Sequence, residues 1–258
     1  MNDVLLAGAQ TRHSLKGFIR NSQALIFTVI MPVFMLLLFN AIFKGYTLFD
    51  GMRVPVASYY TASIISYQIM LTSFSTVLIS ITTDRERGIL KRMRGTPMPR
   101  WVYLVSVIGR TIIVVTLTVA ILVVIGVAFY HVKLSGDTFW GLVVYTEVGT
   151  ACMSALGLAA TRLCATTDAA SAFGPFATVI LAFISGVFIP IDLMPSWLLD
   201  IGKFFPLEHS ARGLQTAFVV HGSTGITTVN LGILAIWGFF GLLGAIFTFR
   251  WESFGATS

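Results

Sequence analysis

The most densely charged stretch of the 258-residue chain is Thr83–Arg100, TDRERGILKRMRGTPMPR, which holds six of its seventeen Lys and Arg residues. Ile89, Leu90 and Met93 fall on one face of a helix drawn through this stretch, and basic side chains surround that face. An apolar face ringed by charge suits a contact with another macromolecule that is both specific and reversible.

Local signals give this helix a start and an end. Thr83 and Glu86 match the capping box, in which each side chain satisfies a free backbone donor of the other residue. Gly95 and Pro97 then form a stop signal. The sequence therefore predicts a short amphipathic helix over 84–95. A basic loop that only fixes membrane topology would explain the charges, but it would need neither the cap nor the stop.

Motifs for catalysis are missing from the rest of the sequence. No P-loop, G-x-S-x-G elbow or HExxH pair occurs, and the string GSTGITT from Gly222 lacks the lysine that would reach a phosphate. Cys152 and Cys164 lie about 18 Å apart if they share a helix, too far for a disulfide. We expect no enzyme activity, no metal and no cofactor in this chain, and two buried free thiols.

Composition places the chain in a membrane. Hydrophobic residues make up 56% of it, charged residues only 11%, and the mean hydropathy is +0.86. A soluble domain has about a quarter of its residues charged. The net charge of +6 could suggest nucleic acid, but no soluble domain is left to bind it. We therefore expect a membrane protein that does not bind nucleic acid.

Six apolar runs are each about as long as a helix that crosses a bilayer. They are 23–43, 59–82, 101–130, 139–161, 170–189 and 229–249. The expected fold is thus a single all-α integral membrane domain over 1–258. Lys and Arg residues in alternate connections number eleven on one side and five on the other. By the positive-inside rule, both termini and the helix at 84–95 face the cytoplasm.

The N-terminal segment 1–22 is expected to form an amphipathic helix in the membrane interface. Arg12, Lys16 and Arg20 recur at a spacing of four and share one helical face. Such a basic stripe would lie against lipid headgroups. A solvated basic tail is the alternative.

Between the fifth and sixth runs, 190–222 reads as short external helices. Pro190 ends the fifth run, Pro195 suits the first turn of a new helix, and Pro206 ends that helix. A further helix from Glu208 to about Val219 returns the chain to the sixth run. These helices are too short to cross the bilayer. They either contribute to transport or form an ordered external loop.

Four polar residues inside the runs are candidates for a pathway: Asn40, Gln68, Arg110 and Glu147. Intramembrane charges are costly and usually mark a partner or a polar cavity. Arg110 is the one oppositely charged candidate partner for Glu147 inside the runs, and a structural ion pair between them is the simplest interpretation. Alanines at 151, 155 and 159 form a small-residue stripe that lets helices approach closely.

At this point the chain resembles a known family, the ABC-2 type permeases, which are the membrane subunits of bacterial ABC exporters. The charged stretch is similar to the family's cytosolic motif after the second span, with Asp84-Arg85-Glu86-Arg87-Gly88-Ile89-Leu90, Met93-Arg94 and Thr96-Pro97 in its positions. Lys91 stands where the family often has an acidic residue. The segment Ser185–Phe218 resembles the family's sequence after the fifth span.

The resemblance implies roles for both motifs. It identifies 84–95 as a coupling helix that docks on a separate ATPase subunit, with its apolar face in a groove of that subunit. The coupling residues are then Asp84, Arg85, Glu86, Arg87, Gly88, Ile89, Leu90, Lys91, Arg92, Met93 and Arg94. It also implies external re-entrant helices marked by Gly186, Pro190, Pro195, Trp197 and Pro206, which would cap an exit path.

The resemblance further implies a dimer of permease subunits in the bacterial inner membrane, surrounded by lipid and paired with ATPase subunits that hold the ATP and Mg. The expected function is export of an amphiphilic drug or a lipid. Polysaccharide or glycolipid export is the alternative within the family. A secondary transporter is a third reading, although the two halves of the sequence show no matching interrupted helices. An integral membrane enzyme is disfavoured because the catalytic motifs are missing.

Overall fold

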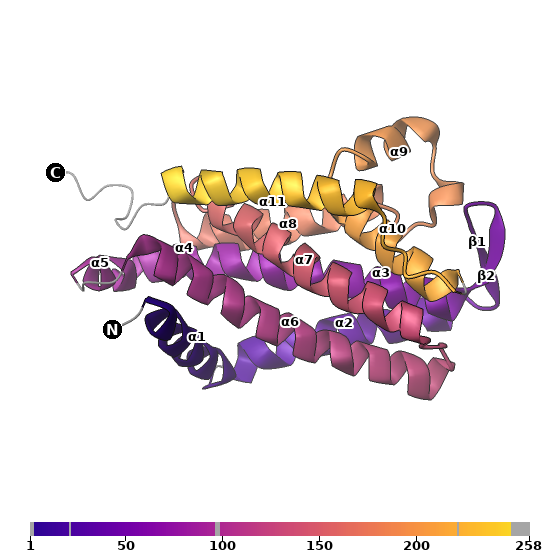
Figure 1. The fold of residues 1–258 in the computed structure, drawn as a ribbon, viewed down its shortest axis with the longest axis horizontal. Helices are drawn as coiled ribbons and strands as arrows, with labels where there is room; N and C mark the ends of the chain where they lie inside the picture. The colour runs from indigo at the N-terminus through magenta and orange to yellow at the C-terminus, as the bar shows by residue number, and fades with distance from the viewer. Residues whose placement is uncertain (1–2, 21, 96–98, 221, 249–258) are drawn as a thin grey trace.

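The computed structural model describes residues 3–20, 22–95, 99–220 and 222–248. Its long helices run side by side in one bundle, with small elements gathered at the two ends (Figure 1). In chain order the elements are α1 (Asp3–Arg20), α2 (Ser22–Ile42), β1 (Tyr46–Phe49), β2 (Met52–Pro55), α3 (Val56–Met70), η1 (Leu71–Thr76), α4 (Val77–Glu86), α5 (Ile89–Arg94), α6 (Arg100–Tyr130), α7 (Gly136–Ala160), α8 (Thr167–Ile184), η2 (Ile191–Leu193), α9 (Ser196–Gly202), α10 (Pro206–Val219) and α11 (Thr228–Thr248).

Five helical stretches in the described residues are long and apolar enough to cross a membrane. They are Val56–Glu86, Trp101–Tyr130, Gly136–Ala160, Thr167–Ile184 and Thr228–Phe247. They correspond to the second to sixth predicted runs, and α2 corresponds to the first. The apolar part of α2 that meets the same description, Thr28–Ile42, is shorter. The fold is therefore that of an all-α membrane protein, and the count of six spans stays a prediction.

The second predicted span is longer than expected and contains a wide helical turn. It runs unbroken through α3, the π-helical segment η1 and α4. Two glycines bring neighbouring helices close to η1. A Cβ on Gly157 of α7 would lie 2.7 Å from the carbonyl oxygen of Phe74, and one on Gly174 of α8 would lie 2.6 Å from Oγ of Ser75. Close packing on both sides thus surrounds the irregular turn.

The predicted capping box at Thr83 and Glu86 is wrong. Both residues lie inside α4, where the hydroxyl of Thr83 donates to the carbonyl oxygen of Ile79 at 2.8 Å. The apolar helix simply continues into the charged stretch, so no free backbone donors exist for Thr83 to cap. The chain breaks instead at Gly88, whose φ of 69° is left-handed and favours glycine. The predicted helix over 84–95 is therefore the end of α4, a glycine turn and the short α5.

A β-hairpin that the sequence analysis did not predict joins α2 to α3. Its turn residues Asp50 and Gly51 both have positive φ, 48° and 75°. That conformation matches the type I′ turn for which Asp-Gly is a favoured pair. Phe49 and Val54 are buried and pack with Tyr59 of α3, so the hairpin is fastened to the bundle.

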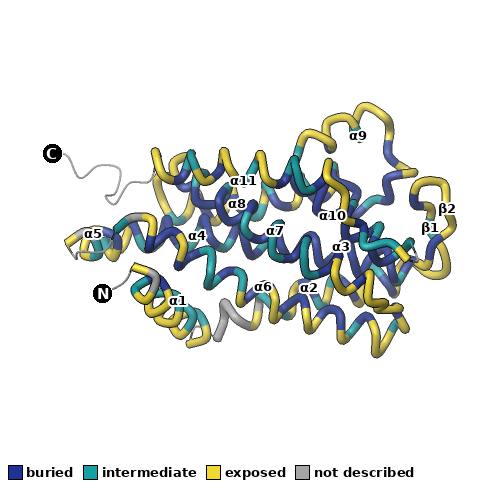
Figure 2. The backbone as a smooth tube through the Cα atoms, viewed as in Figure 1, coloured by how far each residue is buried: buried dark blue, intermediate teal, exposed yellow. Residues whose placement is uncertain are grey.

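The small-residue stripe on α7 meets glycines of α11. A Cβ on Gly241 would lie 3.0 Å from the backbone of Ala155, and one on Gly244 would lie 3.2 Å from the side chain of Ala159. The prediction that the stripe allows close helix packing is confirmed for Ala155 and Ala159. Figure 2 shows the buried backbone concentrated in the middle of the bundle, with α1 and α9 largely exposed.

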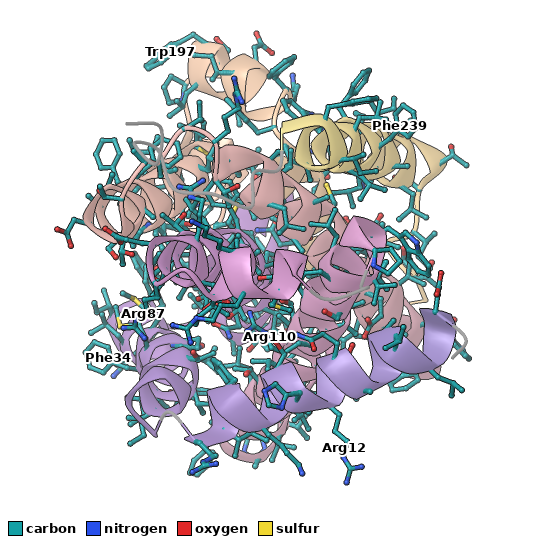
Figure 3. The ribbon with its side chains drawn as sticks, turned by 90° about the vertical axis from the view of Figure 1, so that its left-hand side faces the viewer. Arg12, Phe34, Arg87, Arg110, Trp197 and Phe239 are labelled. Carbon is teal, nitrogen blue, oxygen red and sulfur yellow. The ribbon has the colours of Figure 1, made fainter. Side chains whose placement is uncertain are left out.

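Helix α1 forms where an N-terminal helix was predicted and lies across one end of the bundle, against α6, while its place in the membrane interface stays a prediction. Figure 3 views this end and shows Arg12 pointing away from the other helices. The packing side of α1 carries small residues: Ala7 is buried, and Thr11 lies 3.4 Å from the position a Cβ on Gly109 of α6 would take.

Candidate functional site

The charged stretch is an ordered part of one end of the bundle and not a loop. Figure 1 places α5 beyond α4 at one extremity, on the same end as α1. Gly88 turns the chain out of α4, and α5 begins at the next residue. Three interactions behind this turn fix its position, and each comes from a residue that the sequence analysis assigned to the coupling surface.

Arg85 is the first, and it is buried inside the chain. Its guanidinium donates to the backbone carbonyl oxygens of Thr161 at 2.9 Å, of Ala165 at 3.3 Å, and of Cys164. These carbonyls belong to the end of α7 and the loop to α8, where helix carbonyls lack intrahelical partners. Arg85 therefore ties the end of the second span to the α7–α8 turn. Burial raises the pKa of the Cys164 thiol, although the neighbouring Arg85 acts in the opposite direction.

Glu86 and Asp84 supply the other two interactions. Glu86 accepts hydrogen bonds from the backbone N–H of Thr167, at 3.0 Å, and from its hydroxyl, at the start of α8. A carboxylate at a helix N-terminus is also favoured by the helix dipole. Asp84 is half-buried and interacts electrostatically with Arg110 of α6. The acidic residues thus hold this end of the bundle together.

Helix α5 turns one apolar residue inward and the other outward. Leu90 is 0% exposed and packs with Val77 and Tyr103 in this chain's own core, whereas Ile89 is 37% exposed. The expectation that Leu90 fills a groove on a partner is therefore wrong, because its contacts are internal. Met93 is partly buried against the same cluster.

The outward surface of this end is formed by Arg87, Ile89, Lys91 and Arg92, all of them exposed. Figure 3 shows Arg87 at this end of the molecule. The side chain of Arg94 lies outside the described residues. This set is called the α5 surface below. It is basic, centred on one apolar side chain, and held rigidly from behind.

The opposite end of the bundle contains the second predicted motif. Helix α8 ends at Ile184, five residues before the predicted end of the fifth run, and Gly186 follows with a φ of 70°. The carbonyl oxygen of Gly186 accepts hydrogen bonds from the hydroxyl of Tyr59 at 2.5 Å and from the amide of Gln215 at 2.9 Å. A glycine turn clamped by two other helices therefore ends α8.

The prolines of this segment delimit short helices. Pro190 and Pro195 directly precede η2 and α9, and Pro206 is the first residue of α10 rather than only a stop. Trp197 of α9 is exposed at the outside of the bundle (Figure 3). Helix α10 is buried over most of its length against α3 and α7 and is part of the helical core, whereas α9 is largely exposed.

Polar contacts of α10 connect three separate parts of the chain. His209 lies 3.0 Å from the amide oxygen of Asn230 in α11. Arg212 donates to both carboxylate oxygens of Asp50 in the hairpin turn, at 2.9 and 3.1 Å, and lies 3.7 Å from the buried carboxylate of Glu208. The sequence analysis missed Asp50, Arg212 and Gln215, whose partners are brought to them only in the folded bundle.

The four intramembrane polar candidates do not form one site. Asn40 and Gln68 are buried: the amide of Asn40 donates to its own helix at Leu36, and that of Gln68 to Thr72 at 2.8 Å. Neither lines an open path within the described chain. The predicted pair of Arg110 and Glu147 is also wrong. Arg110 interacts electrostatically with Asp84 and Tyr103, and Glu147 accepts a hydrogen bond from Thr116 at 2.8 Å.

These observations define a class of protein. Apolar helices form a bundle, a basic helix is fixed at one end, and short helices are packed into the other. No cluster of metal-ligating side chains occurs in the described residues. The molecule is a multi-pass membrane protein with an exposed basic surface at one end.

Comparison with known proteins identifies the family. The family profile described as ABC-2 type transporter matches residues 7–219, and the chain belongs to this family. The protein YvfS of Bacillus subtilis, whose name describes it as a transport permease, is 24% identical over 209 residues, which cover 79% of this chain and 82% of YvfS. The resemblance stated from the sequence is thereby confirmed, and the chain is a membrane subunit of an ABC transporter.

A second relative is longer. YbhR of Escherichia coli K12, named as a multidrug ABC transporter permease, is 25% identical over 176 residues. This alignment covers 65% of the present chain and 46% of YbhR, so the chain matches about half the length of that relative.

Proposed function

We propose that this chain is the export permease of an ATP-driven transporter and that the α5 surface docks a separate ATPase subunit. The observation that carries the proposal is the construction of this end of the bundle. Internal contacts that fix α5 are made by Arg85, Glu86 and Leu90, whereas Ile89 and Arg92 remain exposed. A rigidly held, basic surface with one exposed apolar residue suits a contact that transmits force.

The second span gives the proposed contact a direct connection to the other end of the bundle. It runs from Tyr59, which holds the Gly186 turn, through η1 to α4 and the Gly88 turn. Movement of α5 would therefore be transmitted to the segment that contains α9 and α10. π-Helical turns are frequent at functional positions, and η1 lies between the two ends.

The remaining parts of the proposal concern orientation and cargo. The end with α1 and α5 faces the cytoplasm of a bacterium, as the positive-inside rule favours. A second permease subunit completes the transporter, and ATP and Mg belong to the ATPase subunits. The cargo is an amphiphile, a drug or a lipid, taken from the cytoplasm or the inner leaflet. The name of YbhR supports a drug-like cargo.

Transport driven by ATP tests this function. Inside-out vesicles containing the chain and its ATPase are expected to take up a fluorescent amphiphile when ATP is added, and not when only an ion gradient is imposed. The Ile89→Asp variant should insert normally but show no ATP-driven uptake. Uptake driven by an ion gradient without ATP would instead identify a secondary transporter.

A further inference from the structure

Glu147 places a carboxylate in the middle of the spanning zone. It lies near the midpoint of α7, and its partner Thr116 lies near the midpoint of α6. The hydroxyl of Thr116 donates to Oε1 of Glu147 at 2.8 Å. Glu147 is half-buried and Thr116 is exposed, so the pair lies at the surface of the bundle and not in its core.

One hydroxyl does not satisfy this carboxylate. An ionised carboxylate has about four acceptor positions, and water is scarce at this depth. No ion pair to Glu147 is found in the described part of the chain, and Arg110 interacts electrostatically with Asp84 instead. A charged residue at the centre of a membrane is costly and usually has a counter-charge. An ionised Glu147 would be stabilised by a cation, and the described residues do not supply one.

An apolar groove begins one helical turn from Glu147. It has a volume of about 250 Å³ and lies between α6, α7 and α11. Ala151, on the same face of α7 as Glu147, lines it together with Val148 and Ala155. Across the groove are Gly238 and Phe239 of α11, and Figure 3 shows Phe239 on the outside of the bundle.

Small side chains keep the groove open. Alanine and glycine form much of its lining, so neighbouring helices touch without filling the space above them. Drug-sized pockets measure about 300–1,000 Å³. The groove thus accommodates a compact molecule or one part of a larger one. Its lining is apolar, and Glu147 lies one helical turn along α7 from the lining residue Ala151.

We propose that Glu147, Thr116 and this groove bind a lipophilic organic cation that enters sideways from the membrane. The apolar body occupies the groove, and the positive charge lies beside the carboxylate. Charge complementarity selects a cation, and the apolar lining selects one that partitions into lipid. The site deepens the proposed function by naming a cargo class, and it rests on that function only for the claim that the bound cation is exported.

Binding to the full-length chain in lipid nanodiscs tests the site without ATP or an ATPase. The probe is radiolabelled tetraphenylphosphonium, and tetraphenylborate serves as an anion of similar size and shape. Glu147→Gln removes the charge while keeping an acceptor for Thr116. Ala151→Leu fills the groove and keeps the charge. Asp137→Asn is the matched control, because it removes an exposed carboxylate from the first turn of the same helix.

The wild type and Asp137→Asn are expected to bind the cation saturably, and the anion should show only partitioning into lipid. Glu147→Gln and Ala151→Leu should each weaken cation binding by about ten-fold or more, because the first removes the negative charge and the second fills the apolar groove. Unchanged binding in Glu147→Gln, equal binding of the anion, or no saturable binding in the wild type would overturn the site. In each of those cases ATP-driven uptake of another amphiphile would leave the proposed function standing.

Discussion

Truncating Leu90 should release α5 from the bundle. Leu90 is 0% exposed and is the one residue of α5 that is fully buried among those whose side chains are described, in a cluster with Val77 and Tyr103. Leu→Ala at a buried site costs about 2–5 kcal/mol. A helix of six residues has no stability of its own in water, so its order depends on this contact.

A loss of about 3 kcal/mol corresponds to about a hundred-fold change in the opening equilibrium, because each 1.4 kcal/mol is a factor of ten. Hydrogen exchange of peptides covering 88–95, measured in nanodiscs, should therefore show strongly reduced protection in Leu90→Ala. Ile89→Ala, which truncates a 37% exposed neighbour, is the control and should change little. Equal protection in wild type and Leu90→Ala would refute the inward packing of α5.

Further substitutions probe three other sets of contacts, each by thermal unfolding in detergent. Arg85→Gln should destabilise by about 2–3 kcal/mol, because it leaves carbonyls at the end of α7 without their charged donor. Gly213→Ala should cost about 1–3 kcal/mol or more, since its Cβ would lie 2.0 Å from a buried tyrosine ring. Gly232→Ala in α11 meets nothing and should not destabilise, with a gain of up to about 1 kcal/mol from helix propensity. Asp50→Asn keeps a residue that tolerates the positive φ and removes a solvent-exposed pair worth at most about 1 kcal/mol. Arg212→Ala should cost about twice as much, because a buried carboxylate also loses its neighbour.

The third span could be predicted closely because its apolar run is long and follows Pro99 and Arg100, whereas the second is longer than predicted and the fifth ends earlier. The third run, 101–130, matches Arg100–Tyr130 closely. Asp50–Gly51 carried a usable hairpin signal, and it was missed because the search concerned long apolar runs. The early end of α8 depends on the Gly186 carbonyl meeting Tyr59 and Gln215, which are far away in sequence.

The position of the candidate site could be predicted from the sequence, but the directions in which its side chains face could not. Periodicity shows that Leu90 and Ile89 lie on a helix, but it does not say which side chain faces this chain's own core. Spacing along two helices likewise allowed long side chains to join Arg110 and Glu147, but it did not give their rotation about the helix axes. In the bundle they interact with different neighbours, Arg110 with Asp84 and Glu147 with Thr116.

The central claim, that the α5 surface holds the ATPase, is tested most directly by the amount of ATPase that co-purifies with the chain. Ile89→Asp places a charge at the centre of the surface. Ile226→Asp is the control, because Ile226 has nearly equal exposure, 38% against 37%, and lies just before α11 at the end of the bundle opposite to α5. Both variants should insert and fold as the wild type does. The account predicts that Ile226→Asp retains the ATPase at the wild-type ratio and that Ile89→Asp loses about nine-tenths of it or more, as at an interface hot spot. Wild-type ATPase content in Ile89→Asp would contradict it.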